Sequence, residues 1–213
     1  NISCEIPSGC IYGMVGSNGA GKSTFLRVIA GIYKADSGIV TIEGENVYEN
    51  PNIKSKIAFV PDDLFFLPGA SMKRMAKLYK SIYSDFDDNK FYELAAVLEL
   101  NTSASINTFS KGMKRQAATI MALARNPKLI FFDETFDGLD PVVRALIKKL
   151  ICDNVIANNA TAIITSHSLR ELEDTCDQLA LLHKGGLVFE SDIENLKTSL
   201  FKIQVAFSES IRQ

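Results

Sequence analysis

The chain has 213 residues, of which 46% are hydrophobic and 23% are charged, and its formal net charge at pH 7 is -2. These values are ordinary for one globular domain and give no bulk electrostatic attraction to nucleic acid or an anionic membrane. The sequence contains no apolar run of about 18 residues, the length needed to span a membrane. The N-terminus lacks a signal-peptide pattern. The four cysteines show no C-x-x-C spacing, which favours reduced thiols in a cytosolic protein.

The first third of the chain reads as short strands and one helix. Alternating apolar residues predict a strand at 2–6, and an apolar run predicts another at 11–15, followed by a glycine-rich turn. Apolar residues at helical spacing predict a helix over 22–30. Two more short strands are expected at 39–42 and 57–60.

A helical lobe is predicted between about residues 65 and 125, inserted into an α/β core. Its three helices are indicated by apolar residues with a spacing of three and four: Met75, Leu78, Tyr79 and Ile82; Phe91, Leu94, Ala95 and Leu98; Ala117, Ile120, Met121 and Ala124.

Strands and helices alternate again after the lobe, which predicts a mainly parallel sheet covered on both faces. The expected elements are strand 129–132, helix 141–156, strand 161–165, helix 169–176 and strand 179–182. A last alternating run, 201–207, suggests that residues 200–213 begin a truncated accessory segment at the end of a single domain, 1–213.

A phosphate-binding loop follows the strand at 11–15. The stretch from Gly16 to Ser23 matches G-x-x-x-x-G-K-[ST] between a strand and a helix. Its backbone N–H groups and the helix N-terminus would surround phosphates, Lys22 would contact the β- and γ-phosphates, and Ser23 would ligate Mg²⁺. The candidate nucleotide-binding residues are Gly16, Ser17, Asn18, Gly19, Ala20, Gly21, Lys22, Ser23 and Thr24. The fold class is therefore an α/β P-loop NTPase core with a mainly parallel sheet, a small antiparallel β region and the helical lobe.

Two adjacent carboxylates end the apolar strand at 129–132. In P-loop NTPases an aspartate at such a strand end holds the Mg²⁺ of the nucleotide, which assigns Asp133 to the metal. Glu134 is one residue further and is a candidate general base for the attacking water. The alternative is that both acids face water in a surface loop.

Several further motifs resemble those of the ATP-binding cassette (ABC) ATPases, over nearly the whole chain. Ser110-Lys111-Gly112-Met113, with Gln116, is similar to the family signature loop. Residues 136–140 resemble its D-loop, and His167 stands at a strand end where the family has its switch histidine. A plain polar cap is the alternative for His167.

This resemblance implies that two cassettes pack head to tail around ATP. Ser110 and Gly112 of one cassette would complete the ATP site of the other, and His167 would hydrogen-bond the γ-phosphate and align the water with Glu134. The catalytic residues would be Glu134, His167 and Lys22, and the metal ligands Ser23, Asp133 and Asp62.

Four positions differ from the family pattern. Met113 replaces the glutamine of the signature loop. Asp62 stands where the family usually has the Q-loop glutamine, and it would approach Mg²⁺ either directly or through water. Lys111 replaces a glycine and either adds charge near the partner's phosphates or points into water. Thr135 replaces the proline that usually follows the two acids.

The resemblance implies an exporter-like transporter subunit at the inner face of the cell membrane. ATP-driven dimerisation with a second nucleotide-binding domain would drive a membrane-spanning permease, and no nucleic acid is expected. The apolar stretch 64–67 is either a docking surface for the permease or part of the lobe core. The alternative is a soluble ABC ATPase acting on ribosomes or DNA. A GTPase or small-molecule kinase fits less well, because N-K-x-D is absent and neither class explains the signature-like loop.

Overall fold

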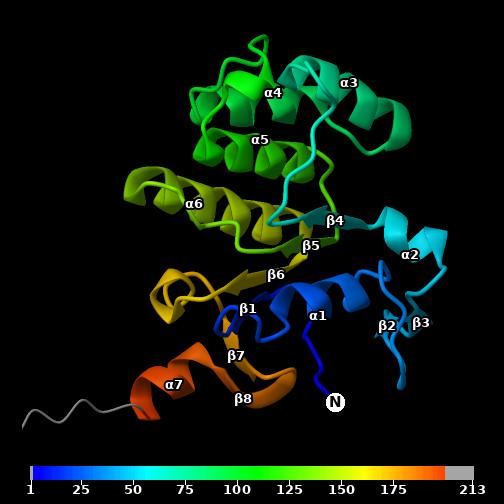
Figure 1. Cartoon of the computed structure of the whole chain (residues 1–213), viewed down its shortest axis with the longest axis vertical. Coiled ribbons are helices and arrows are strands. Elements are labelled where there is room, and N and C mark those ends of the chain that lie inside the picture. Colours follow the sequence, from blue (N-terminus) through cyan, green and yellow to red (C-terminus); the bar gives the residue numbers. More distant parts are fainter. Residues whose placement is uncertain (1, 200–213) are drawn as a thin grey trace, which may run out of the picture.

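A six-stranded sheet forms the centre of the computed structural model, which describes residues 2–199 (Figure 1). The strands lie in the order β4-β5-β6-β1-β7-β8, and every neighbouring pair is parallel except β7 and β8. They are β1 (Ile11–Val15), β4 (Ile57–Val60), β5 (Leu129–Phe132), β6 (Thr161–Ser166), β7 (Gln178–His183) and β8 (Gly186–Asp192). The predicted accessory segment at 200–213 lies outside the described residues.

A separate two-stranded antiparallel sheet and four helices complete the core. The small sheet pairs β2 (Thr41–Ile42) with β3 (Glu45–Asn46). The helices of the core are α1 (Lys22–Ile29), α2 (Pro51–Ser55), α6 (Pro141–Asn158) and α7 (Ile193–Ser199). The predicted α/β fold class, with its parallel sheet and small antiparallel region, is confirmed.

The two faces of the large sheet bury two different hydrophobic cores. Successive side chains of a strand point to opposite faces of the sheet, so consecutive residues of β5 lie in different cores. Ile130 and Phe132 pack in the core that contains Ile147 of α6, whereas Phe131 packs in the core that contains Leu26 of α1. Covering both faces explains why the central strands are apolar without a break.

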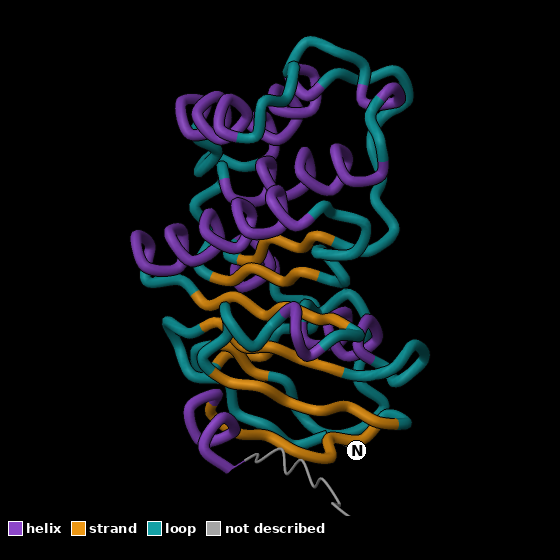
Figure 2. The backbone as a smooth tube through the Cα atoms, turned by 90° about the vertical axis from the view of Figure 1, so that its left-hand side faces the viewer, coloured by secondary structure: helices purple, strands orange, loops and turns teal. Residues whose placement is uncertain are grey.

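The helical lobe lies beyond the β4 edge of the sheet (Figures 1 and 2). It consists of α3 (Met72–Ile82), α4 (Asp88–Val97) and α5 (Lys111–Leu123), in the predicted order. Ser71, Asp87 and Ser110 each accept a hydrogen bond from a first-turn N–H, which fixes where these helices begin. Short 3₁₀ turns occur at Ile106–Thr108 and Leu169–Glu171.

A buried arginine fastens the lobe to the core directly after α5. Arg125 donates to the carbonyl oxygens of Ile57, at 2.8 Å, and Ser55, at 2.5 Å. Its guanidinium also lies 3.6 Å from the centre of the Tyr83 ring. Because these carbonyls flank the start of β4, the C-terminal end of α5 is held against the sheet.

Three predicted elements differ from the structure. Residues 2–6 form no strand, because no described strand pairs with them. The strand expected at 39–42 is only two residues long. The helix expected at 169–176 is a 3₁₀ turn followed by hydrogen-bonded turns. There, buried Leu172 and Cys176 pack directly on the backbone of Gly13, which pulls the segment onto the sheet.

Candidate active site

The carboxyl ends of β1, β4, β5 and β6 meet at one edge of the sheet, because these strands are parallel. The loops that follow them surround a cleft of about 450 Å³. It is lined by residues 18–24, Asp62, Glu134, Asp137 and His167. The topology therefore brings together the phosphate loop, Glu134, His167 and Asp62, which are far apart in sequence.

The phosphate loop presents a bare helix N-terminus to the cleft. Gly21 is the N-cap of α1 with a φ of 103°, a left-handed conformation that favours glycine, and no side chain caps the helix. The first-turn N–H groups are thus suited to hold an anion. Lys22 donates to the carbonyl oxygens of Gly16, at 2.6 Å, and Ser17, at 3.2 Å, so its ammonium group lies inside the loop.

Gly16 has no room for a side chain. A Cβ built on it would lie 2.5 Å from the carbonyl oxygen of Leu182, which belongs to the backbone and cannot rotate away. We expect Gly16→Ala to displace the loop, weakening nucleotide binding at least about tenfold and lowering the free energy of unfolding by about 2 kcal/mol. Titration with a fluorescent ATP analogue and thermal denaturation measure these effects.

Gly186→Ala is the matched control, because its Cβ would meet only an ordinary contact of 3.6 Å with the carbonyl oxygen of His183. It should leave nucleotide affinity unchanged. Equal losses in both variants would show that the close approach at Gly16 is not what shapes the loop.

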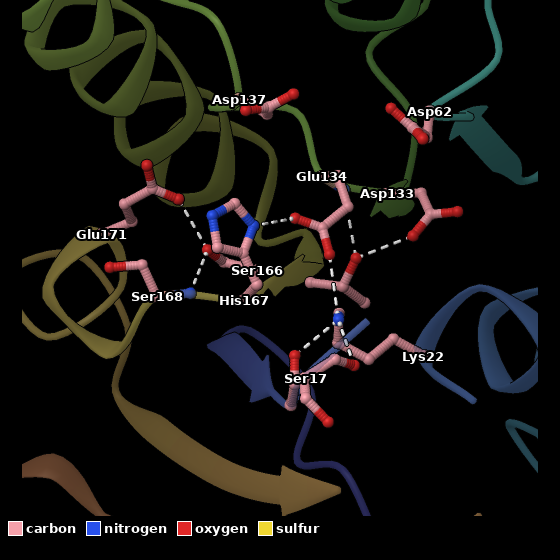
Figure 3. A network of polar contacts seen from close by, with 12 residues as sticks. Ser17, Lys22, Asp62, Asp133, Glu134, Asp137, Ser166, His167, Ser168 and Glu171 are labelled. Atoms are coloured by element: carbon pink, nitrogen blue, oxygen red, sulfur yellow. Dashed lines mark hydrogen bonds and ion pairs between the residues drawn. The ribbon is translucent and has the colours of Figure 1, made fainter. Parts of the chain in front are cut away.

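Glu134 stands at the centre of the polar network (Figure 3). One carboxylate oxygen lies 2.9 Å from the Lys22 ammonium nitrogen, and the other lies 3.1 Å from Nδ1 of His167. The Glu134 backbone has a φ of 49°, which is uncommon for a residue with a side chain, and its N–H donates to the Thr165 hydroxyl at 3.1 Å. The fold thus holds a strained residue with its carboxylate aimed into the cleft.

Asp133 is fully buried and has one unsatisfied oxygen. Its Oδ1 accepts a hydrogen bond of 2.8 Å from the Thr165 hydroxyl, whereas Oδ2 has no hydrogen-bond partner. A buried carboxylate oxygen without a donor fits a cation. No group of three or more His, Cys, Asp or Glu side chains within residues 2–199 would hold a metal alone.

The signature-loop residues do not line this cleft. Ser110 caps α5, its hydroxyl accepting from the N–H of Met113 at 3.2 Å. A Cβ on Gly112 would lie 3.2 Å from the carbonyl oxygen of Gly138, so this loop touches the D-loop of its own chain. The Lys111 ammonium lies 2.7 Å from Asp137. This hydrogen bond from Lys111, with smaller contributions from Arg115 and His167, holds the pKa of the Asp137 carboxyl below its ordinary value.

Three residues of the site were not predicted as site residues. Thr165 orients Asp133 and the Glu134 backbone together, and its position in a parallel strand next to β5 is the only sequence signal for it. Asp137 enters the cleft from the D-loop. Arg115 is buried in α5 and pairs with Asp62, a contact that no local pattern indicates.

Comparison with known proteins identifies the family of the chain. The ABC transporter family model matches residues 1–137. The chain is 32% identical over 211 residues to the ABC transporter ATP-binding protein YtrB of Bacillus subtilis, covering 99% of this chain and 72% of the relative. It is 30% identical over 200 residues to the bacitracin transport ATP-binding protein BcrA of Bacillus licheniformis, covering 92% of this chain and 65% of the relative.

Solved structures share the fold. An ATP-binding subunit of an ABC transporter superposes with a TM-score of 0.81 at 24% identity, covering 90% of this chain and 82% of its own. The ATP-binding cassette MJ0796, a dimer in a post-hydrolysis state with ADP and Pi, superposes with a TM-score of 0.78 at 22% identity, covering 91% and 89%. With the family model matching more than half of it, the chain belongs to the ABC transporter family as an ATP-binding and ATP-hydrolysing subunit.

Proposed function

We propose that two nucleotide-binding domains of this kind close head to tail around ATP and that this closure drives a membrane-spanning partner. The observation that carries the proposal is the position of the signature loop. Ser110 and Gly112 lie outside the cleft of their own chain, although the family resemblance assigns them to an ATP site. A second chain, turned to face the first, would supply them.

Each side chain in the cleft has a chemical part in this proposal. Lys22 and the N-terminus of α1 would bind the β- and γ-phosphates. Glu134 would accept a proton from the attacking water, and His167, on the other oxygen of Glu134, would keep that carboxylate aligned. As ATP enters, the Lys22 ammonium group would exchange its ion pair with Glu134 for one with the phosphate.

Asp133 and Ser23 would hold Mg²⁺, which when bound neutralises phosphate charge. Asp62 faces the cleft but is paired with Arg115, so it would reach the metal only through water.

The membrane partner would contact the surface near the end of β4. Of the stretch 64–67, Leu64, Phe66 and Leu67 pack against the hydrophobic core, whereas the Phe65 residue is 77% exposed. The stretch is therefore divided between lobe core and surface, and Phe65 is the candidate contact. Within residues 2–199 no helix is long and apolar enough to cross a bilayer. The chain would act on the cytoplasmic side, docked on a separate permease. A solved structure with the same fold, cbiO1 from Clostridium perfringens, is part of the ABC transporter complex cbiONQ.

Mixing two inactive variants tests whether the active site is shared. Lys22→Met should destroy the phosphate site and Gly112→Asp the signature loop, so each homodimer should be inactive. A dimer with one chain of each variant keeps one site in which both the phosphate loop and the signature loop are intact. An equal mixture should recover roughly a quarter of the wild-type ATPase activity, because about half of the dimers are mixed and each has one working site.

The control mixture combines Lys22→Met with Lys22→Met/Gly112→Asp, which cannot form an intact site in any pairing. It should remain inactive. Recovery in neither mixture, with both variants folded and Gly112→Asp still binding ATP, would contradict the shared site.

A further inference from the structure

The largest fully buried side chain of the described residues is a cation beside the cleft. Arg115 lies in the first turns of α5 and is 1% exposed. Its Nη2 atom lies 2.5 Å from Asp62 and 3.8 Å from Asp137. Its Nε and Nη1 have no hydrogen-bond partner. A buried guanidinium with so few partners is costly unless its carboxylates stay in place.

Both carboxylates face the nucleotide cleft. Asp62 follows β4 of the core and Asp137 follows Glu134, and their labelled side chains lie above Glu134 in the view of Figure 3. Asp137 also has Lys111 as a cation partner, at 2.7 Å. Within the described residues, Arg115 is the only cation that pairs with Asp62.

An acid at position 62 creates an electrostatic difficulty for a triphosphate site. A carboxylate on the wall of the cleft repels the phosphates, and water screens only part of this repulsion although the Asp62 side chain is 54% exposed. The Arg115 guanidinium, held 2.5 Å from Oδ1 of Asp62, neutralises that charge and fixes the orientation of the carboxylate. Because Arg115 belongs to α5 and Asp62 to the end of β4, the pair also joins the lobe to the core beside the cleft.

We propose that Arg115 is a positioning residue of the ATPase, which neutralises Asp62 and, together with Lys111, Asp137, so that an acid at position 62 is compatible with ATP binding. This rests on the proposed function of the cleft. Arg115 acts through the two carboxylates and does not itself line the cleft. Removing its charge leaves Asp62 free to repel ATP, and removing the Asp62 charge as well relieves that repulsion.

The test is the effect of Arg115→Met on steady-state kinetics, alone and combined with Asp62→Asn. Arg115→Met should raise the KM for MgATP about tenfold, as expected for exposing one like charge at the cleft. The double variant should recover a KM within about threefold of wild type, because the carboxylate charge that would repel ATP is no longer there. A purely structural role would give no such recovery of KM.

Arg125→Met is the matched control, since Arg125 is also buried and pairs with Asp85, and neither residue lines the cleft. It should lower thermal stability without raising KM, and adding Asp85→Asn should restore nothing. Arg115→Gln, which keeps a donor for Asp62 but not the charge, is a second variant and should also raise KM. An unchanged KM in the folded Arg115 variants, or no recovery in the double variant, would overturn the inference. A wild-type protein that does not bind MgATP would instead overturn the proposed function.

Discussion

Replacing Glu134 with glutamine is expected to lower kcat for ATP hydrolysis at least about 100-fold, the usual contribution of a general base. The amide keeps the shape of the side chain but cannot accept the proton of the attacking water. It also removes the negative charge 2.9 Å from Lys22, which leaves the ammonium group free for phosphate. ATP should therefore bind at least as tightly as in the wild type and accumulate in a long-lived dimer.

Two measurements separate this role from a structural one. Single-turnover hydrolysis gives the loss in the chemical step, and size-exclusion chromatography with ATP gives the dimer. Glu173→Gln, an exposed acid after the Leu169–Glu171 turn, is the matched control and should behave as wild type. Hydrolysis at the wild-type rate by Glu134→Gln would eliminate Glu134 as the base.

Asp133→Asn is expected to lower kcat/KM for MgATP by about 100-fold or more, because a metal contact made in a buried site is lost. The Asp133 oxygen without a hydrogen-bond partner is the atom expected to face the cation, and an amide there carries no charge. The other oxygen keeps its acceptor role toward Thr165, so the fold should be retained. Electron paramagnetic resonance of Mn²⁺ with ATP would show weaker metal binding directly.

The control for this variant is Asp174→Asn, which removes an exposed aspartate paired with Lys148 away from the cleft. Its Mn²⁺ affinity and activity should match the wild type. If Asp133→Asn binds Mn²⁺ with ATP as tightly as the wild type, then Asp133 does not hold the metal.

The features that the sequence predicted well depend on short segments. The phosphate loop needs a strand, a glycine-rich turn and a helix in immediate succession, so one stretch of chain contains the whole signal. Glu134 and His167 follow apolar strands directly, and parallel strands bring such ends to one edge. The structure places both at the cleft with Lys22.

The features that the sequence did not predict depend on contacts between distant segments. The pair of Arg115 and Asp62 joins the lobe to the core, and neither residue has a local pattern that indicates the other. Lys111 pairs with Asp137 of its own D-loop, whereas the sequence suggested only phosphate or water as its surroundings. The segment 169–176 has helical periodicity, but its two buried side chains, Leu172 and Cys176, pack against Gly13 of β1, and no α-helix forms.

Helix α5 is anchored to the core at its C-terminal end by Arg125, through backbone carbonyls, and is held near its opposite end by the side-chain ion pairs of Lys111 and Arg115. Its 13 residues extend about 20 Å at 1.5 Å per residue, from the anchored end to Ser110. A tilt of roughly 10° about that anchor would carry the opposite end about 3 Å, the length of a hydrogen bond. A small rotation of the lobe would therefore displace the Ser110 end of α5, where a neighbouring subunit would meet it, much more than the anchored end.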